Sequence, residues 1–252
     1  MRVETEDGVR TITFDRPEVK NAMTREVAEE LADALNGDPE QLDAIVIEGE
    51  GDAFCAGGDL AGMATREETA AEGAASLEAS FGRVVENAMT CPIPVIGKVH
   101  GDAVGAGLAV AAVADISVAA ESARFSCAFV RVGLIPDTGG TFLLPRLVGP
   151  QRAKRLAFTG EFLDGREAAD LGLVAETVPD DELDERVEEL VGVLGRRPTR
   201  TIGLTKRAIN ENLGRPWQDA LDREHALQVR AASTPEHEEG VAAFLEGREP
   251  EF

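Results

Sequence analysis

The chain has 252 residues, 43% of them hydrophobic, enough to bury the core of one large domain or of one domain with an appendage. Its 25 basic and 47 acidic residues give a formal net charge of −22, which disfavours nucleic acid and anionic membranes as partners. No apolar run approaches the roughly 18–20 residues needed to span a bilayer. The first ten residues contain no signal-peptide core, so we expect a cytoplasmic protein.

The acid excess also suggests a salt-rich environment, where high ionic strength screens the self-repulsion of the surface. Only four of the basic residues are lysines; a GC-rich genome would explain that scarcity but not the acid excess. The three cysteines (Cys55, Cys91 and Cys127) have no metal-ligand or disulfide spacing. We therefore expect no metal site. The acid excess, in turn, is best explained by a halophilic origin.

The predicted elements begin with a β-hairpin over residues 2–14, turning at Asp7-Gly8. A helix should follow, with Thr24 as its N-cap and Gly37 as its stop. Residues 43–48 then have the apolar composition of a buried strand.

Further along, residues 65–89 are expected to be helical, beginning with a capping box at Thr65. A strand over 94–99, an apolar helix over 104–114 and a strand over 116–119 come next. Strands and helices alternate in this way to about Pro179, which favours an α/β fold built of strand–strand–helix units.

From Asp180 onward only helices are predicted, at about 180–195, 198–212, 216–231 and 235–246. This tail has the pattern of an oligomerisation or lid element. Trp217, the single tryptophan, is expected in its core.

Two glycine-rich segments point to chemistry carried by the backbone. Gly105-Ala106-Gly107 opens the apolar helix, and small residues there let a ligand approach unpaired N–H groups that favour negative charge. Phe54–Leu60 (FCAGGDL) provides a second loop of close approach. Two such loops aimed at one oxygen would form an oxyanion hole.

These segments resemble the crotonase superfamily, the enoyl-CoA hydratase/isomerase family, over essentially the whole chain. Each motif is weak alone, but their order and spacing together are specific. They are DRPEVKNAM (15–23), FCAGGDL (54–60), Gly101–Asp115, GLIPDTGG (133–140) and the C-terminal FLEGREPEF. The resemblance implies a crotonase-like spiral over residues 1–195 and a C-terminal helical trimerisation region over 196–252. It also implies acyl-CoA thioester substrates, no separate cofactor, and homotrimers or hexamers.

By the same resemblance, the oxyanion hole would use the N–H groups of Gly58 and Ala106. Hydratases of the family carry two glutamates at the positions of Ala109 and Phe129, and neither Ala nor Phe can move a proton or orient water. Asp137 stands where isomerase members place an aspartate, and Phe125–Gly149 is most similar to the phenylacetate-pathway ring-epoxide/oxepin-CoA isomerase branch. Asp137 is therefore the predicted acid/base, with an ordinary turn residue as the alternative.

The remaining candidate site residues are predicted to bind substrate. They are Arg16, Lys20, Ala22, Ala56, Asp59, Leu60, Phe129 and Phe142. Arg16 and Lys20 are candidates for CoA phosphate contacts, and Asp59 has a loop-shaping role as its main alternative. The predicted activity is an acyl-CoA isomerase that shifts a double bond or opens a ring epoxide. A hydratase and a catalytically silent CoA-binding subunit remain open as alternatives, as does the choice between aromatic degradation and fatty acid oxidation.

Overall fold

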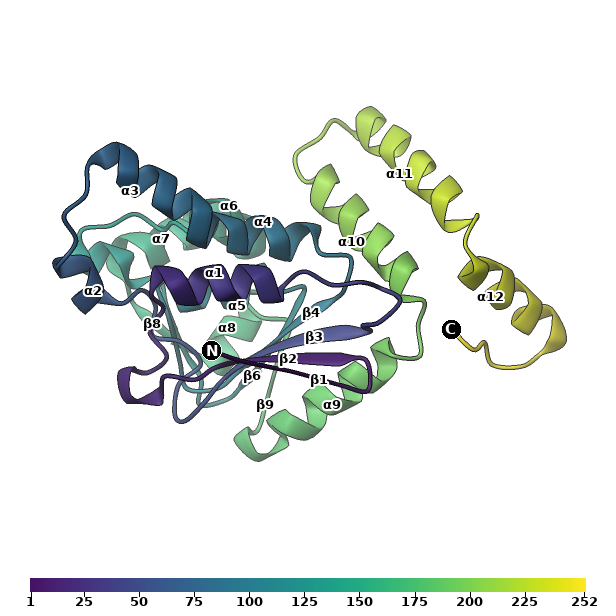
Figure 1. The fold of residues 1–252 in the computed structure, drawn as a ribbon, viewed down its shortest axis with the longest axis horizontal. Helices are drawn as coiled ribbons and strands as arrows, with labels where there is room; N and C mark the ends of the chain where they lie inside the picture. The colour runs from purple at the N-terminus through teal and green to yellow at the C-terminus, as the bar shows by residue number, and fades with distance from the viewer.

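Six strands form the main sheet of the computed structural model, which describes residues 1–252 (Figure 1). Their order is β1-β2-β3-β4-β6-β9, with β1 and β2 antiparallel and every other neighbouring pair parallel. The strands are β1 (Arg2–Glu6), β2 (Val9–Phe14), β3 (Ala44–Gly49), β4 (Val95–Val99), β6 (Ile116–Ala120) and β9 (Glu176–Val178). The hairpin prediction is confirmed: Asp7 and Gly8 both have positive φ, as a type I′ turn requires.

A second, smaller sheet has the order β5-β7-β8. Its strands are β5 (Asp102–Val104), β7 (Arg124–Ser126) and β8 (Phe162–Asp164). The chain runs from a strand of the main sheet to a strand of the small sheet and then into a helix, first as β4-β5-α5 and then as β6-β7 and α6. The predicted α/β fold of strand–strand–helix units is therefore confirmed.

Twelve α-helices complete the chain. They are α1 (Arg25–Ala34), α2 (Leu60–Ala64), α3 (Ala70–Leu77), α4 (Arg83–Thr90), α5 (Ala106–Val113), α6 (Gly140–Leu147), α7 (Pro150–Thr159), α8 (Gly165–Asp170), α9 (Leu183–Leu194), α10 (Thr199–Asn212), α11 (Trp217–Ala231) and α12 (Pro235–Glu246). Short 3₁₀ turns occupy residues 17–19, 128–132 and 180–182, and residues 78–82 form one π-helical turn. No helix is both long enough and apolar enough to cross a membrane.

Three predicted helix boundaries are wrong. Thr65 ends α2 instead of opening a helix, and the capping box is formed by Thr69 and Glu72 at the start of α3. The glutamate that Thr65 needed, Glu68, is held by two 2.6 Å hydrogen bonds from Arg25. The contact between Arg25 and Glu68 therefore favours the capping box at Thr69 over the similar sequence signal at Thr65.

Gly37 does not stop α1, which ends at Ala34, and it has no left-handed backbone. A Cβ at Gly37 would lie 2.7 Å from the Ile93 side chain, so the glycine allows close packing. The predicted helix over 104–114 is shorter than expected, because residues up to Val104 belong to β5 and Gly105 then turns the chain with a φ of +57°.

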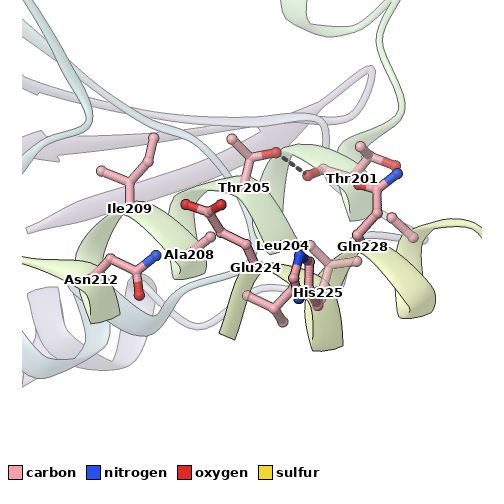
Figure 2. Close-up of a pocket in the computed structure, with 11 residues that line it drawn as sticks. Thr201, Leu204, Thr205, Ala208, Ile209, Asn212, Glu224, His225 and Gln228 are labelled. Carbon is pink, nitrogen blue, oxygen red and sulfur yellow. Dashed lines mark hydrogen bonds between the residues drawn. The ribbon is translucent and has the colours of Figure 1, made fainter. Parts of the chain in front are cut away.

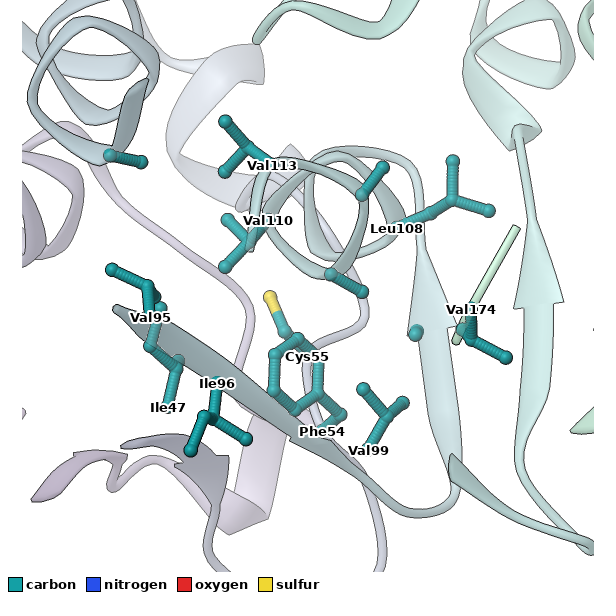
Figure 3. Packing of buried hydrophobic residues seen from close by; sticks show 14 of the residues in the cluster. Ile47, Phe54, Cys55, Val95, Ile96, Val99, Leu108, Val110, Val113 and Val174 are labelled. Atoms are coloured by element: carbon teal, nitrogen blue, oxygen red, sulfur yellow. The ribbon is translucent and has the colours of Figure 1, made fainter. Parts of the chain in front are cut away.

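One part of the hydrophobic core lies between the main sheet and α5 (Figure 3). All eight residues of α5 are buried, as expected for a helix that is apolar on every side. Figure 3 shows Val110 and Val113 of α5 above Phe54 and Cys55 of the loop after β3 and Val95 of β4. The start of α5 is thus fixed by packing around its whole circumference.

Helix α10 is anchored to the core by a buried ion pair. The Lys206 ammonium donates to Asp115 Oδ2 at 2.6 Å, and that carboxylate also accepts from the Val95 N–H at 2.8 Å. A Cβ at Gly203 would lie 2.4 Å from the Pro92 carbonyl oxygen, so the helix also approaches the chain closely.

Helices α11 and α12 extend away from the sheet (Figure 1). A groove runs between α10 and α11, where the Thr205 hydroxyl donates to the Thr201 carbonyl at 2.9 Å (Figure 2). The prediction that Trp217 lies in the core of this tail is wrong: it begins α11 and is exposed, because no other element covers that side of the helix.

Candidate active site

The two glycine-rich segments are joined by backbone hydrogen bonds. The Cys55 N–H donates to the Asp102 carbonyl and the Val104 N–H donates to the Cys55 carbonyl, both at 2.9 Å. A Cβ at Gly107 would lie only 2.1 Å from the Cys55 carbonyl oxygen, so no larger residue fits there without movement. The loop after β3 and the start of α5 therefore form one rigid unit.

This unit presents two unpaired amides. The Gly58 N–H donates to no group of the protein, although the flanking Gly57 carbonyl and Asp59 N–H both bond to Met23. Ala106 is the first residue of α5, so its N–H has no acceptor within the helix. The α5 N-terminus has no side-chain cap and no acidic residue in its first turn, which leaves its partial positive charge available to a ligand.

Glycine keeps the space between these amides open. Gly57 has a φ of +98°, and a Cβ there would lie 2.7 Å from the Val104 carbonyl oxygen and 3.5 Å from the Ala106 nitrogen. The two loops therefore approach each other closely beside these amides. This is the arrangement that an oxyanion hole requires.

Both amides border a cavity of about 260 Å³. Six predicted site residues line it together: Ala56, Gly58, Leu60, Ala106, Phe129 and Asp137. The remaining lining residues are Gly57, Met63, Arg66, Leu77, Phe81, Val104, Gly105, Ala128, Arg131, Val132 and Leu134. The lining is mainly apolar and contains a single carboxylate.

That carboxylate is Asp137, placed by the turn between the 3₁₀ segment at 128–132 and α6. Its backbone carbonyl accepts from the Gly140 N–H at 2.8 Å, so Asp137 does form a turn, as the alternative interpretation expected. Asp137 nevertheless lines the cavity as well. One residue therefore meets both descriptions.

Burial raises the pKa of Asp137 above its ordinary value, since the apolar surroundings disfavour the charged form. The Thr138 hydroxyl donates to Asp137 Oδ1 at 3.0 Å, which opposes this effect without cancelling it. Asp137 forms no ion pair. A raised pKa makes an aspartate a stronger base, as proton abstraction from carbon requires.

The two positions where family hydratases carry glutamates offer no acid or base. Ala109 is fully buried in α5 and is not among the cavity-lining residues. Phe129 lines the cavity, and its Cζ atom lies 4.0 Å from where a Cβ on Gly105 would be. An aromatic ring therefore stands beside the candidate oxyanion hole, where a water-binding carboxylate would have to act.

Five predicted substrate-binding residues lie outside the lining. Arg16 donates to the Ala22 carbonyl at 2.8 Å and pairs with Asp59 at 3.5 Å. Asp59 caps α2 by accepting from the Gly62 N–H at 3.1 Å, and this bond, helped by Arg16, lowers the pKa of Asp59. These contacts give Arg16, Ala22 and Asp59 a visible loop-shaping role.

Lys20 and Phe142 are likewise occupied by other contacts. The Lys20 ammonium lies 2.9 Å from Asp102 Oδ2, and the Phe142 ring on α6 lies 3.5 Å beneath the Arg146 guanidinium. Their roles toward a substrate stay predictions.

Sequence reasoning missed most of the cavity wall formed by residues 60–81, namely Met63, Arg66, Leu77 and Phe81. Residues 60–79 include no buried side chain, so they carry no hydrophobic periodicity that would mark them as facing anything. The π-helical turn at 78–82 would have been the one indication, since such turns are frequent at functional sites, but it has no sequence signature.

The Cys55 thiol belongs to the first loop, is buried, and is unsuited to nucleophilic chemistry. Burial raises its pKa to about 12, which leaves almost no thiolate at neutral pH.

Comparison with known proteins places this chain in a family. The model of the family described as Enoyl-CoA hydratase/isomerase matches residues 4–252. An Escherichia coli protein named 1,2-epoxyphenylacetyl-CoA isomerase is 37% identical, over 98% of this chain and 95% of its own length. A Rhodobacter capsulatus protein named "Probable enoyl-CoA hydratase" is 39% identical, over 100% of this chain and 97% of its own length.

A solved structure of a Mycobacterium smegmatis enoyl-CoA hydratase superposes with a TM-score of 0.91 at 32% identity, covering 99% of this chain and 97% of that one. The chain belongs to the enoyl-CoA hydratase/isomerase family, and its fold is the crotonase fold. It is an enzyme of a family whose members act on acyl-CoA thioesters.

Proposed function

We propose that the protein is an acyl-CoA isomerase that moves a carbon–carbon double bond of an enoyl thioester. The observation that carries this proposal is the position of Asp137, the one carboxylate in a cavity bordered by two unpaired amides. A single acid/base suits a reaction in which the proton taken up is also the proton returned.

In the proposed mechanism the N–H groups of Gly58 and Ala106 donate to the thioester oxygen. The ionised Asp137 takes a proton from the α-carbon of a 3-enoyl thioester, and the negative charge spreads over the thioester oxygen and the γ-carbon. The two amides stabilise that charge where it develops. The protonated Asp137 then returns the proton to the γ-carbon, which leaves the double bond conjugated with the carbonyl group.

The same groups would serve a ring substrate. A ring-derived thioester presents the same acidified carbon, and the E. coli relative named 1,2-epoxyphenylacetyl-CoA isomerase supports a role in phenylacetate degradation. Fatty acid metabolism is the other setting, supported by a Streptococcus mutans relative named Trans-2-decenoyl-[acyl-carrier-protein] isomerase, 33% identical over 98% of this chain.

Hydration is the second candidate, and relatives bearing hydratase names favour it. Against it stand Ala109 and Phe129, since a hydratase needs a side chain that holds and splits water. A silent CoA-binding subunit is the third interpretation.

The deciding experiment offers a 3-enoyl-CoA and the matching 2-enoyl-CoA separately, in high salt. Conversion of the former to the conjugated thioester without water addition supports the isomerase. Rapid hydration of the latter, with no isomerisation, would replace the proposal by the hydratase, and binding without turnover would leave only a silent subunit.

The setting of the enzyme completes the proposal. Exposed apolar side chains on the C-terminal helices, including Val229, Phe244 and Leu245, support assembly into homotrimers or hexamers. The −22 charge supports a halophilic origin and opposes nucleic acid as a partner. Three free cysteines fit a reducing, cytoplasmic setting. The proposed proton transfer is redox-neutral and uses CoA only as part of the substrate, so it calls for no separate cofactor.

A further inference from the structure

Helices α3 and α4 form one continuous helical stretch that is interrupted by the π-helical turn Glu78–Gly82. Two adjacent side chains, Ser80 and Phe81, are buried in this turn. The Ser80 hydroxyl donates to the Ser76 carbonyl at 2.6 Å, satisfying an acceptor near the site where the regular hydrogen-bond ladder is broken. The irregular turn is therefore stabilised locally.

The consequence of this turn is the position of Phe81. Its side chain belongs to the hydrophobic core and also lines the cavity beside the candidate oxyanion hole. The preceding helix α3 has no buried residue, and its Leu77 borders the same cavity from a more open position. Phe81 is thus the point where the cavity wall meets the core.

The side chains that line the cavity divide into buried and exposed ones. Phe81 is 5% exposed and Phe129 is 8% exposed, whereas Leu60 is 52% exposed and Leu77 is 39% exposed. The two phenylalanines come from different parts of the chain and belong to the hydrophobic core, while the two leucines are open to solvent. An acyl group that enters past Leu60 and Leu77 would therefore meet aromatic rings held in the core.

The size of the cavity agrees with a short reach. Its volume of about 260 Å³ lies below the ~300–1,000 Å³ of typical small-molecule sites. Part of this space must hold the thioester group itself. The remainder suits a short-chain or single-ring acyl group better than a long fatty chain.

We propose that Phe81, positioned by the π-helical turn, is the end-stop of the acyl pocket and restricts the enzyme to short-chain or single-ring acyl thioesters. This inference rests on the proposed function only in assuming that an acyl-CoA occupies the cavity, and it makes no claim about the reaction that follows.

Binding of saturated acyl-CoAs tests the proposal independently of catalysis. Affinities of butanoyl-, hexanoyl-, octanoyl- and decanoyl-CoA would be measured by calorimetry in high salt for the wild type, Phe81→Ala and Phe81→Trp. Each methylene that is buried should strengthen binding about fourfold. In the wild type this gain should end within the series, and in Phe81→Ala it should continue, raising the decanoyl-to-butanoyl affinity ratio by on the order of tenfold or more. Phe81→Trp should move the break toward shorter chains.

Val84→Ala is the matched control, because Val84 lies three residues further along, is fully buried and does not line the cavity. It should lower stability without changing the order of chain lengths. If Phe81→Ala does not fold, as judged by circular dichroism, Phe81→Leu replaces it with a smaller opening in the same direction. Unchanged affinity ratios in the folded variants overturn the proposal.

Failure of the proposed function gives a different result. A wild type that binds acyl-CoAs with a chain-length limit but never moves a double bond refutes the isomerase and leaves the end-stop intact. A wild type that isomerises long and short chains equally well refutes the end-stop and leaves the isomerase intact.

Discussion

Replacing Asp137 by asparagine removes the only carboxylate in the cavity while nearly preserving the shape of the side chain. General acid–base catalysis contributes about 10²- to 10⁴-fold to a rate. Because no other lining residue has a carboxylate to substitute for Asp137, we expect a loss near the upper end of that range. This corresponds to roughly 5 kcal/mol of transition-state stabilisation, at about 1.4 kcal/mol per factor of ten.

The assay follows 3-enoyl-CoA isomerisation through the absorbance of the conjugated thioester, with binding of a saturated analogue measured in parallel. Asp137→Asn should lower kcat by the full amount and change the analogue's affinity by less than about twofold, since the amides of Gly58 and Ala106 are untouched. In the wild type, kcat/KM should fall as the pH drops through the pKa of Asp137, at a higher pH than an ordinary aspartate would give.

The pH dependence of stability tests the raised pKa of Asp137 independently, because the substitution that lowers activity should not lower stability. The folded-state pKa of Asp137 is raised, so between the unfolded and folded pKa values the native state binds more protons and stability falls as pH rises. Above the folded-state pKa the ionised group therefore costs stability in full, and below the unfolded-state pKa it costs nothing. Asp137→Asn should melt at or above the wild-type temperature at neutral pH, with the difference vanishing in acid. Undiminished turnover of Asp137→Asn would refute this account of Asp137. So would a melting temperature of the variant that falls below the wild-type value at neutral pH but not in acid.

Three other variants or conditions test the scaffold. Ala106→Pro deletes one amide donor at the first position of α5, where proline is compatible with a helix. It should lower kcat by about 10²- to 10³-fold. Unchanged kinetics with an intact helical circular dichroism spectrum would remove this amide from the mechanism. Lys206→Met leaves the Asp115 carboxylate without its cation and should lower the free energy of unfolding by about 3 kcal/mol, measured by urea titration. An unchanged urea midpoint would mean that the ion pair contributes nothing to stability. Molar KCl shortens the Debye length from about 10 Å to about 3 Å and should raise the melting temperature by screening the −22 charge, and a constant or falling temperature would contradict salt adaptation.

The parts of the fold that could be predicted are those in which local chemistry and packing agree. The hairpin at Asp7-Gly8 is determined by a two-residue turn, and α5 by an unbroken apolar composition. The start of α3 could not be predicted, because Thr65 and Thr69 carry equivalent capping signals and only the distant Arg25 decides between them. Strand β5 is three residues long and is defined by its partner β7, which no local pattern reveals.

The residues of the candidate site likewise fall into those that the sequence predicts and those that it does not. Gly58, Ala106 and Asp137 occur in motifs because each depends on backbone geometry that particular residues impose, and the structure brings them to one cavity. Leu77 and Phe81 come from a segment without a clear apolar face, and their position depends on how residues 60–81 lie over the rest of the fold. Arg16 and Lys20 illustrate the reverse difficulty: their charge was visible, but their partners Asp59 and Asp102 were not.

The contrast between Gly107 and residues 60–79 bears on how such an enzyme changes its substrate. At Gly107 a single added carbon would collide with the Cys55 backbone, so a substitution there should be strongly destabilising. Residues 60–79 bury no side chain, so substitutions away from the Thr69–Glu72 capping box and the Arg25–Glu68 pair should meet little energetic penalty. A lineage can therefore try many acyl groups by altering the tolerant wall while inheriting the charge-stabilising amides unchanged.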